Sequence, residues 1–179
     1  KITRITMKQL NTLIDKEAQK LLFIFNKSKL SLSTAESCTG GLISTIITSF
    51  SGASSVFMGG IIAYDNEVKN KLLGIPLNII DNNGAVSAAV AEAMSENTVK
   101  MFNTNFAISV TGVAGPNGGS VEKPVGTVWI SISYLIGKSI KTKSNLFCFG
   151  QKSREHIRKL TCYEAMKLAN SIALNNNKN

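Results

Sequence analysis

The chain has 179 residues, of which 44% are hydrophobic and 17% are charged. This length suits one domain with its own hydrophobic core, and the composition excludes a disordered chain. No apolar run approaches the roughly 18 residues of a membrane-spanning helix, and the first residues lack the features of a secretory signal, so we expect a cytoplasmic protein that does not bind membranes. We expect residues 1–179 to form a single domain, with residues 1–7 and 175–179 frayed.

The net charge of +9 is concentrated at the two ends of the sequence. Residues 1–29 and 138–179 hold 16 Lys and Arg against four acids, a balance of +12, whereas residues 30–137 hold four lysines against seven acids, a balance of −3. The ends have the pattern of surface helices with solvated lysines, and few aromatic residues are present to stack on bases. We therefore expect no nucleic-acid partner.

Helices and strands are predicted to alternate along the chain. Apolar spacing and cap residues predict helices over residues 8–27, 42–50, 66–73, 88–102 and 152–174. Alternating and β-branched runs predict strands over residues 30–35, 56–64, 106–110, 125–136 and 140–149, the last two as a hairpin. Gly59 and Gly60 in the second strand indicate a bulge or a close backbone approach.

This order of elements predicts an α/β fold, with a mixed or mostly parallel sheet covered by helices on both faces. Sheets of this class bind ligands at the carboxyl ends of their strands. The turns at residues 36–41 and 111–120 should emerge there.

The cysteines and the single histidine limit the possible chemistry. Cys38, Cys148 and Cys162 lack metal-ligand spacing and are odd in number, so we expect free thiols. His156 lies among charged residues of the last predicted helix, where we expect it at the surface. A histidine-based metal site or catalytic triad has no further histidine to use, so a hydrolase of this sequence needs another base.

Residues 35–41 form a polar, glycine-containing turn between a predicted strand and a predicted helix. The N–H groups at such a helix start can hold developing negative charge, and Ser37 at this position is similar to the exposed nucleophile of an elbow motif. Cys38 is the rival nucleophile, or else a small buried residue. The other interpretation is that Ser37 and Thr39 are helix caps in a tight glycine turn. Local sequence leaves these alternatives open.

A lysine can replace histidine as the base when burial keeps its amine neutral. Lys69 and Lys71 are two residues apart on a short predicted helix, so only one of them can turn inward; both can instead form a solvated face. Tyr64 precedes them and can relay a proton. The glycine-rich loop at 111–120 can approach an anion with its backbone, although it matches no phosphate-loop motif.

Five segments in matching order resemble the CinA C-terminal domain family. They are residues 34–41, 64–69, 84–87, 111–116 and 123–129. The resemblance implies a three-layer α/β/α fold, nicotinamide mononucleotide deamidase activity, no cofactor and a homodimer. It also implies the stand-alone form, without the molybdopterin-binding-like domain that precedes this one in longer relatives.

The resemblance further implies roles for individual residues. Ser37 is then the nucleophile, Lys69 the base and Tyr64 an assisting group, which selects Ser37 over Cys38 and Lys69 over Lys71. The expected substrate-binding residues are Thr39, Gly40, Gly41, Asn66, Thr111, Gly112 and Gly115, with Arg154 or Arg158 as partners of the 5′-phosphate. Met58 and Gly59 replace a Glu-Arg pair of many relatives, which can weaken substrate binding.

Two other functions remain open at this point. One is a non-catalytic interaction module that docks a partner through the basic end helices. The other is an amidohydrolase that acts on a different nucleotide-like amide.

Overall fold

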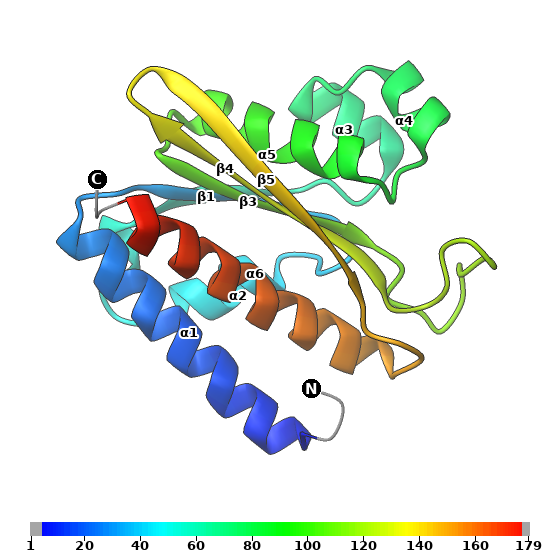
Figure 1. Ribbon diagram of the computed structural model, residues 1–179, viewed down its shortest axis with the longest axis horizontal. Helices are drawn as coiled ribbons and strands as arrows, with labels where there is room; N and C mark the ends of the chain where they lie inside the picture. Colours follow the sequence, from blue (N-terminus) through cyan, green and yellow to red (C-terminus); the bar gives the residue numbers. More distant parts are fainter. Residues whose placement is uncertain (1–4, 177–179) are drawn as a thin grey trace.

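The computed structural model describes residues 5–176 (Figure 1). The helices are α1 (Met7–Lys27), α2 (Leu42–Thr48), the 3-10 helix η1 (Ala53–Ser55), α3 (Asn66–Leu73), α4 (Leu77–Asn83), α5 (Ala88–Phe102) and α6 (Arg154–Asn176). The strands are β1 (Leu32–Glu36), β2 (Phe57–Ile62), β3 (Phe106–Gly112), β4 (Thr127–Ile136) and β5 (Ser139–Cys148). Every predicted element is present, and only the short helices η1 and α4 were not predicted.

The five strands form one mixed sheet in the order β2-β1-β3-β4-β5. β2, β1 and β3 are parallel, whereas β4 and β5 form an antiparallel hairpin beside them. Figure 1 shows α1, α2 and α6 on one face and α3, α4 and α5 on the other. The predicted α/β/α layers are confirmed. The sheet is less parallel than predicted, because the hairpin makes two of its four pairings antiparallel.

The two faces of the sheet bury separate hydrophobic clusters. The larger one joins α1, α2 and α6 to the sheet; within it the rings of Phe25 and Phe106 pack edge to face, 5.0 Å apart. The smaller one, which includes Leu73, Ile80 and Met94, joins α3, α4 and α5 to the opposite face. Both clusters include a residue of β1, Leu32 in the larger and Ala35 in the smaller, so this strand is packed from two sides.

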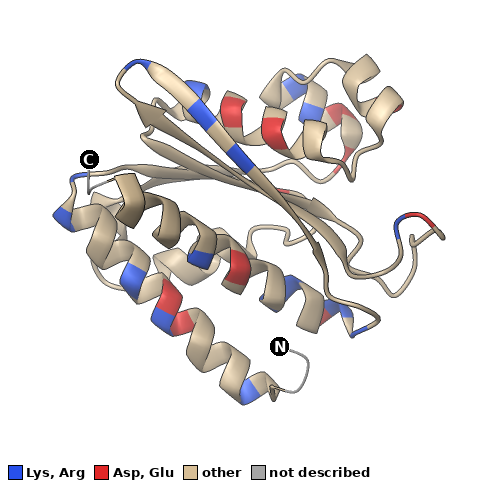
Figure 2. Cartoon of the chain, viewed as in Figure 1, with Lys and Arg blue, Asp and Glu red and all other residues tan. Residues whose placement is uncertain are grey.

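The chain ends contribute basic surface helices, as predicted. Figure 2 shows the Lys and Arg positions of the end segments, in blue, spread over α1, α6 and β5. Residues 1–7 and 175–179 were expected to fray. Thr6, however, caps α1 in a capping box with Gln9, and α6 extends to Asn176, so these residues belong to regular structure. The other frayed positions, 1–4 and 177–179, lie outside the described residues. None of the described helices is long and apolar enough to cross a membrane.

Gly60 marks the close approach between β1 and β2 that the sequence predicted. It pairs with Thr34, and a Cβ on it would lie 2.1 Å from Thr34 Oγ1 and 3.0 Å from Ser44 Oγ. We expect Gly60→Ala to lower the free energy of unfolding by about 1–3 kcal/mol because the added methyl group overpacks this contact. Urea unfolding tests this. In Gly118→Ala the added Cβ meets nothing within 4 Å but the residue has a φ of +86°, so its loss reports backbone strain without overpacking, whereas Gly60 is not in the left-handed region. Wild-type stability in Gly60→Ala would contradict the explanation.

Candidate active site

The predicted nucleophile and the glycine-rich loop leave the same edge of the sheet. Ser37 directly follows β1, and the loop follows β3, the parallel neighbour of β1. The Ser37 N–H donates to Val110 O at 3.0 Å and ties the turn to β3. The expectation that both turns meet at the carboxyl ends of the strands is therefore confirmed.

The Ser37 turn, residues 37–41, closes through a hydrogen bond from Gly40 N–H to Ser37 O at 3.1 Å. Gly40 and Gly41 have φ values of +58° and +89°, in the left-handed region that favours glycine. Within the described part of the chain, the N–H groups of Cys38 and Thr39 donate to no oxygen acceptor. These two donors directly follow Ser37 in the chain and can form an oxyanion hole.

Glu36, which sequence reasoning did not single out, anchors this turn. Its carboxylate is fully buried and accepts from Thr39 Oγ1 (2.7 Å), Ile43 N–H (3.0 Å), and both the N–H (2.8 Å) and the Oγ (2.7 Å) of Ser44. It therefore satisfies the otherwise unpaired N–H groups in the first turn of α2. An acidic residue at the end of a buried strand, just before a helix start, is the signal that could have identified it.

Lys69 is the inward-facing lysine of α3. Asp65 caps this helix, and the Lys69 side chain is only 1% exposed, with Nζ donating to Tyr64 O at 3.0 Å. Burial lowers the pKa of Lys69, and the nearby Asp65 and Cys38 oppose this in part. Lys71 instead lies at the surface in an ion pair with Glu67. Of the two lysines, Lys69 is therefore the one that turns inward.

A cavity of about 210 Å³ lies between the Ser37 turn, α3 and the loop after β3. Its lining consists of Ser37, Cys38, Tyr64, Asn66, Lys69, Ala85, Val86, Thr111, Gly112, Ala114 and Arg154. The cavity therefore brings together the three expected catalytic residues and four of the expected substrate-binding residues. Neither Met58 nor Gly59, both on the edge strand β2, belongs to this lining.

The remaining expected binding residues are not part of this lining. They are Thr39, Gly40, Gly41, Gly115 and Arg158. The Thr39 side chain is fully buried and donates to Glu36, and Arg158 donates from Nε and Nη2 to Thr39 O at 3.1 and 2.5 Å. These side chains hold the backbone of the Ser37 turn.

Arg154 connects two walls of the cavity. Its Nη2 donates to the Tyr64 hydroxyl and its Nη1 to Gly115 O, both at 2.8 Å. Thr111, which also lines the cavity, donates from Oγ1 to Ala85 O at 2.8 Å. The guanidinium thus lies at the exposed side of the cavity, between the loop after β2 and the loop after β3.

Cys38 is poorly suited to act as the nucleophile. Its side chain is 5% exposed, and burial, reinforced by the charge of Glu36, raises the pKa of its thiol to about 12. The thiolate, which is the reactive form, is therefore scarce at neutral pH. All three cysteines are free thiols, as predicted.

His156 and the acidic residues form no metal centre in the part of the chain that the structure describes. His156 is half-buried on α6 rather than fully at the surface, and its Nε2 is buried without a hydrogen-bond partner among the described residues. Within residues 5–176, no three His, Cys, Asp or Glu side chains are grouped in a way that could hold a metal ion.

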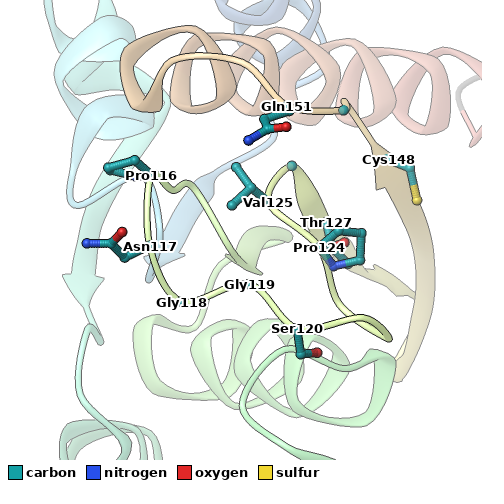
Figure 3. A pocket seen from close by; sticks show the side chains of 12 residues that line it. Pro116, Asn117, Gly118, Gly119, Ser120, Pro124, Val125, Thr127, Cys148 and Gln151 are labelled. Atoms are coloured by element: carbon teal, nitrogen blue, oxygen red, sulfur yellow. The ribbon is translucent and has the colours of Figure 1, made fainter.

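A larger cavity of about 590 Å³ lies farther along the glycine-rich loop (Figure 3). Pro116, Val125 and Gln151 are among its lining residues, and the Cys148 thiol is at its edge. It has no acidic or basic side chain in its lining. We therefore place the candidate active site in the smaller cavity, where a nucleophile and a buried base are found together.

Comparisons with known proteins identify relatives of this chain. The family model of the CinA C-terminal domain matches residues 14–173. A CinA-like protein from Geotalea daltonii is 44% identical over 143 residues, which are 80% of this chain and 33% of that protein. A CinA-like protein from Prochlorococcus marinus subsp. pastoris is 53% identical over 107 residues, 60% of this chain and 25% of that protein. The chain thus spans about a third of the length of the curated relatives it matches, or less.

Solved structures share the fold. The competence/damage inducible protein CihA from Agrobacterium tumefaciens has a TM-score of 0.85 and 36% identity, over 91% of this chain and 96% of that one. A CinA superfamily protein from Klebsiella pneumoniae 700603 has a TM-score of 0.82 over 90% of this chain and 98% of that one. Its identity is 23%, so this second likeness concerns the fold alone.

Proposed function

This chain belongs to the CinA C-terminal domain family, and from that premise we propose that it is an amidohydrolase that converts nicotinamide mononucleotide to nicotinic acid mononucleotide and ammonia. The substrate is the one implied by the five family motifs. The observation that carries the proposal is Lys69, a buried lysine with a lowered pKa that lines the same cavity as Ser37. An interaction module has no need of such a lysine.

The first half of the reaction forms an ester on Ser37. Neutral Lys69 Nζ takes the hydroxyl proton as Ser37 Oγ bonds to the carboxamide carbon, and the carbonyl electron pair moves onto oxygen. The N–H groups of Cys38 and Thr39 hold this oxyanion. As it collapses, the C–N bond breaks, the proton on Lys69 moves to the leaving nitrogen, and ammonia departs.

The second half of the reaction uses the same groups on water. Lys69 takes a proton from a water molecule as its oxygen attacks the ester carbon. The same N–H groups hold the resulting oxyanion. When it collapses, the bond between the carbon and Ser37 Oγ breaks, and the proton on Lys69 moves to that oxygen. The product is the carboxylic acid. Residues of the chain itself accept and donate the proton in every transfer.

Arg154 is the group we assign to the substrate phosphate, because its guanidinium lies at the exposed side of the cavity. We expect Arg154→Met to raise KM for nicotinamide mononucleotide about 10- to 100-fold with little change in kcat, as fits the loss of a charged hydrogen bond. The control is nicotinamide riboside, which lacks the phosphate, and its kcat/KM should stay unchanged. An equal loss of kcat/KM for both substrates would mean that Arg154 supports the cavity walls and does not bind the phosphate.

The direct test of the function is ammonia release by the purified protein, with the acid product identified by chromatography. Nicotinamide mononucleotide, nicotinamide riboside and nicotinamide form the substrate series. We expect turnover to be highest with the mononucleotide. A folded protein that turns over none of the three would contradict the proposal and favour another amide substrate or the interaction module.

We also propose a homodimer, which sedimentation of the active protein tests.

A further inference from the structure

Two groups of opposite charge hold Thr39, two residues after Ser37. On one side its hydroxyl donates to Glu36 Oε2 at 2.7 Å. On the other its carbonyl oxygen accepts from Nε and Nη2 of Arg158. Thr39 is fully buried, and neither its side chain nor Arg158 lines the cavity.

We propose that Thr39 is a positioning residue, which Glu36 and Arg158 hold so that the Ser37 turn presents its N–H groups to the reacting carbonyl. The inference rests on the proposed function in taking Ser37 as the nucleophile. It assigns Thr39 and Arg158 a different role from the substrate contact expected for them.

The hydrogen bonds fix the turn in a definite orientation. The Thr39 C=O and the Gly40 N–H belong to one planar peptide unit, with the oxygen bound by Arg158 and the N–H donating to Ser37 O. This unit cannot rotate without breaking bonds on both sides. The Thr39 hydroxyl, held by Glu36, restrains the same residue through its side chain, so the direction of the Thr39 N–H is set.

The two charged groups are themselves anchored on helices. Glu36 accepts from Ile43 and Ser44 in the first turn of α2. Arg158 lies on α6, which packs against the sheet and α1. The turn is therefore positioned between two helices of one face. Preorganised donors of this kind lower the barrier because they need no rearrangement when charge develops.

Replacement of the Thr39 hydroxyl by a methyl group tests the inference. We expect Thr39→Val to lower kcat about 10- to 100-fold, the effect of one hydrogen bond to a charged group, with KM changed less than about twofold. Thr39→Ser, which keeps the hydroxyl, should recover most of kcat. The matched control is Thr98→Val on α5, a buried threonine whose hydroxyl donates to Met94 O at 2.6 Å and which does not line the cavity. It should lower the melting temperature and leave kcat unchanged.

A fluorophosphonate probe makes the test independent of the natural substrate. The labelling rate of Ser37, followed by mass spectrometry, should fall in Thr39→Val by the same factor as kcat and stay unchanged in Thr98→Val. If the wild-type protein is labelled but hydrolyses no nicotinamide mononucleotide, a slower rate in Thr39→Val still supports the positioning role while the proposed substrate fails. Wild-type labelling rates in Thr39→Val, or equal defects in Thr39→Ser and Thr39→Val, would overturn the inference.

Discussion

Ser37→Ala will reduce kcat for nicotinamide mononucleotide by about 10⁴-fold or more, because no covalent intermediate can form without the hydroxyl. Ser37 lines the cavity and directly precedes Cys38 and Thr39, whose N–H groups donate to no oxygen acceptor in the described part of the chain. Removing a small side chain that is 8% exposed should leave the fold intact. The measurement is ammonia release by the variant, together with its unfolding curve.

Cys38→Ala is the matched control for this prediction. Both side chains line the cavity, but burial keeps the Cys38 thiol protonated, since its pKa is about 12. We expect the control to keep kcat within about threefold of the wild type, since its N–H remains in place. Loss of activity in Cys38→Ala with retention in Ser37→Ala would make Cys38 the nucleophile.

Lys69→Met will also reduce turnover, by about 10³-fold or more, since it removes the buried lysine that lines the cavity. Lys71→Met is the control, because Lys71 is exposed and pairs with Glu67. Its activity should equal that of the wild type. Wild-type activity in Lys69→Met would mean that another group acts as the base.

The lowered pKa of Lys69 also predicts the pH dependence of activity. Only the neutral amine can accept the Ser37 proton, so kcat/KM should rise with pH through the lowered pKa of Lys69 and level off below the ordinary lysine value of 10.5. A kcat/KM that falls across this range would contradict the role of Lys69.

The stability of the protein should follow the same titration. Between the lowered pKa of the folded state and 10.5, the unfolded chain binds the lysine proton and the folded protein does not, so stability rises with pH in this window. Below the window both states carry the proton, and the folded state bears the cost of a buried charge. Lys69→Met should lack this rise and be at least as stable as the wild type below the window. Urea unfolding at several pH values measures both effects.

Much of the fold could be predicted from the sequence because its elements have strong local signals. Asp65 and Ser87 marked helix starts that the structure reproduces, and apolar spacing marked α1. The short helix α4 was missed because it begins after Pro76 and ends in a polar Asp-Asn-Asn segment typical of a loop. Strand order could not be predicted, since it depends on contacts between segments far apart in the chain.

The site was predicted only in part, for a related reason. Local sequence could identify Ser37, Cys38, Lys69 and Lys71 as candidates but could not rank them, because the ranking depends on burial. The role of Glu36 depends on hydrogen-bond donors up to eight residues away. Arg158 was expected at the phosphate because of its charge, yet it donates to Thr39 O, 119 residues earlier in the chain.

The central claim is that the reaction passes through an ester on Ser37, and rapid acid quenching tests it most directly. Cys38→Ala protein is mixed with nicotinamide mononucleotide, quenched at intervals, digested and analysed by mass spectrometry, so that any acyl group on the turn is assigned to Ser37 without ambiguity. The account predicts a nicotinic acid mononucleotide acyl group on the Ser37 peptide that appears before free product and is absent when Ser37 is also replaced by Ala. Full turnover in that double variant would contradict it.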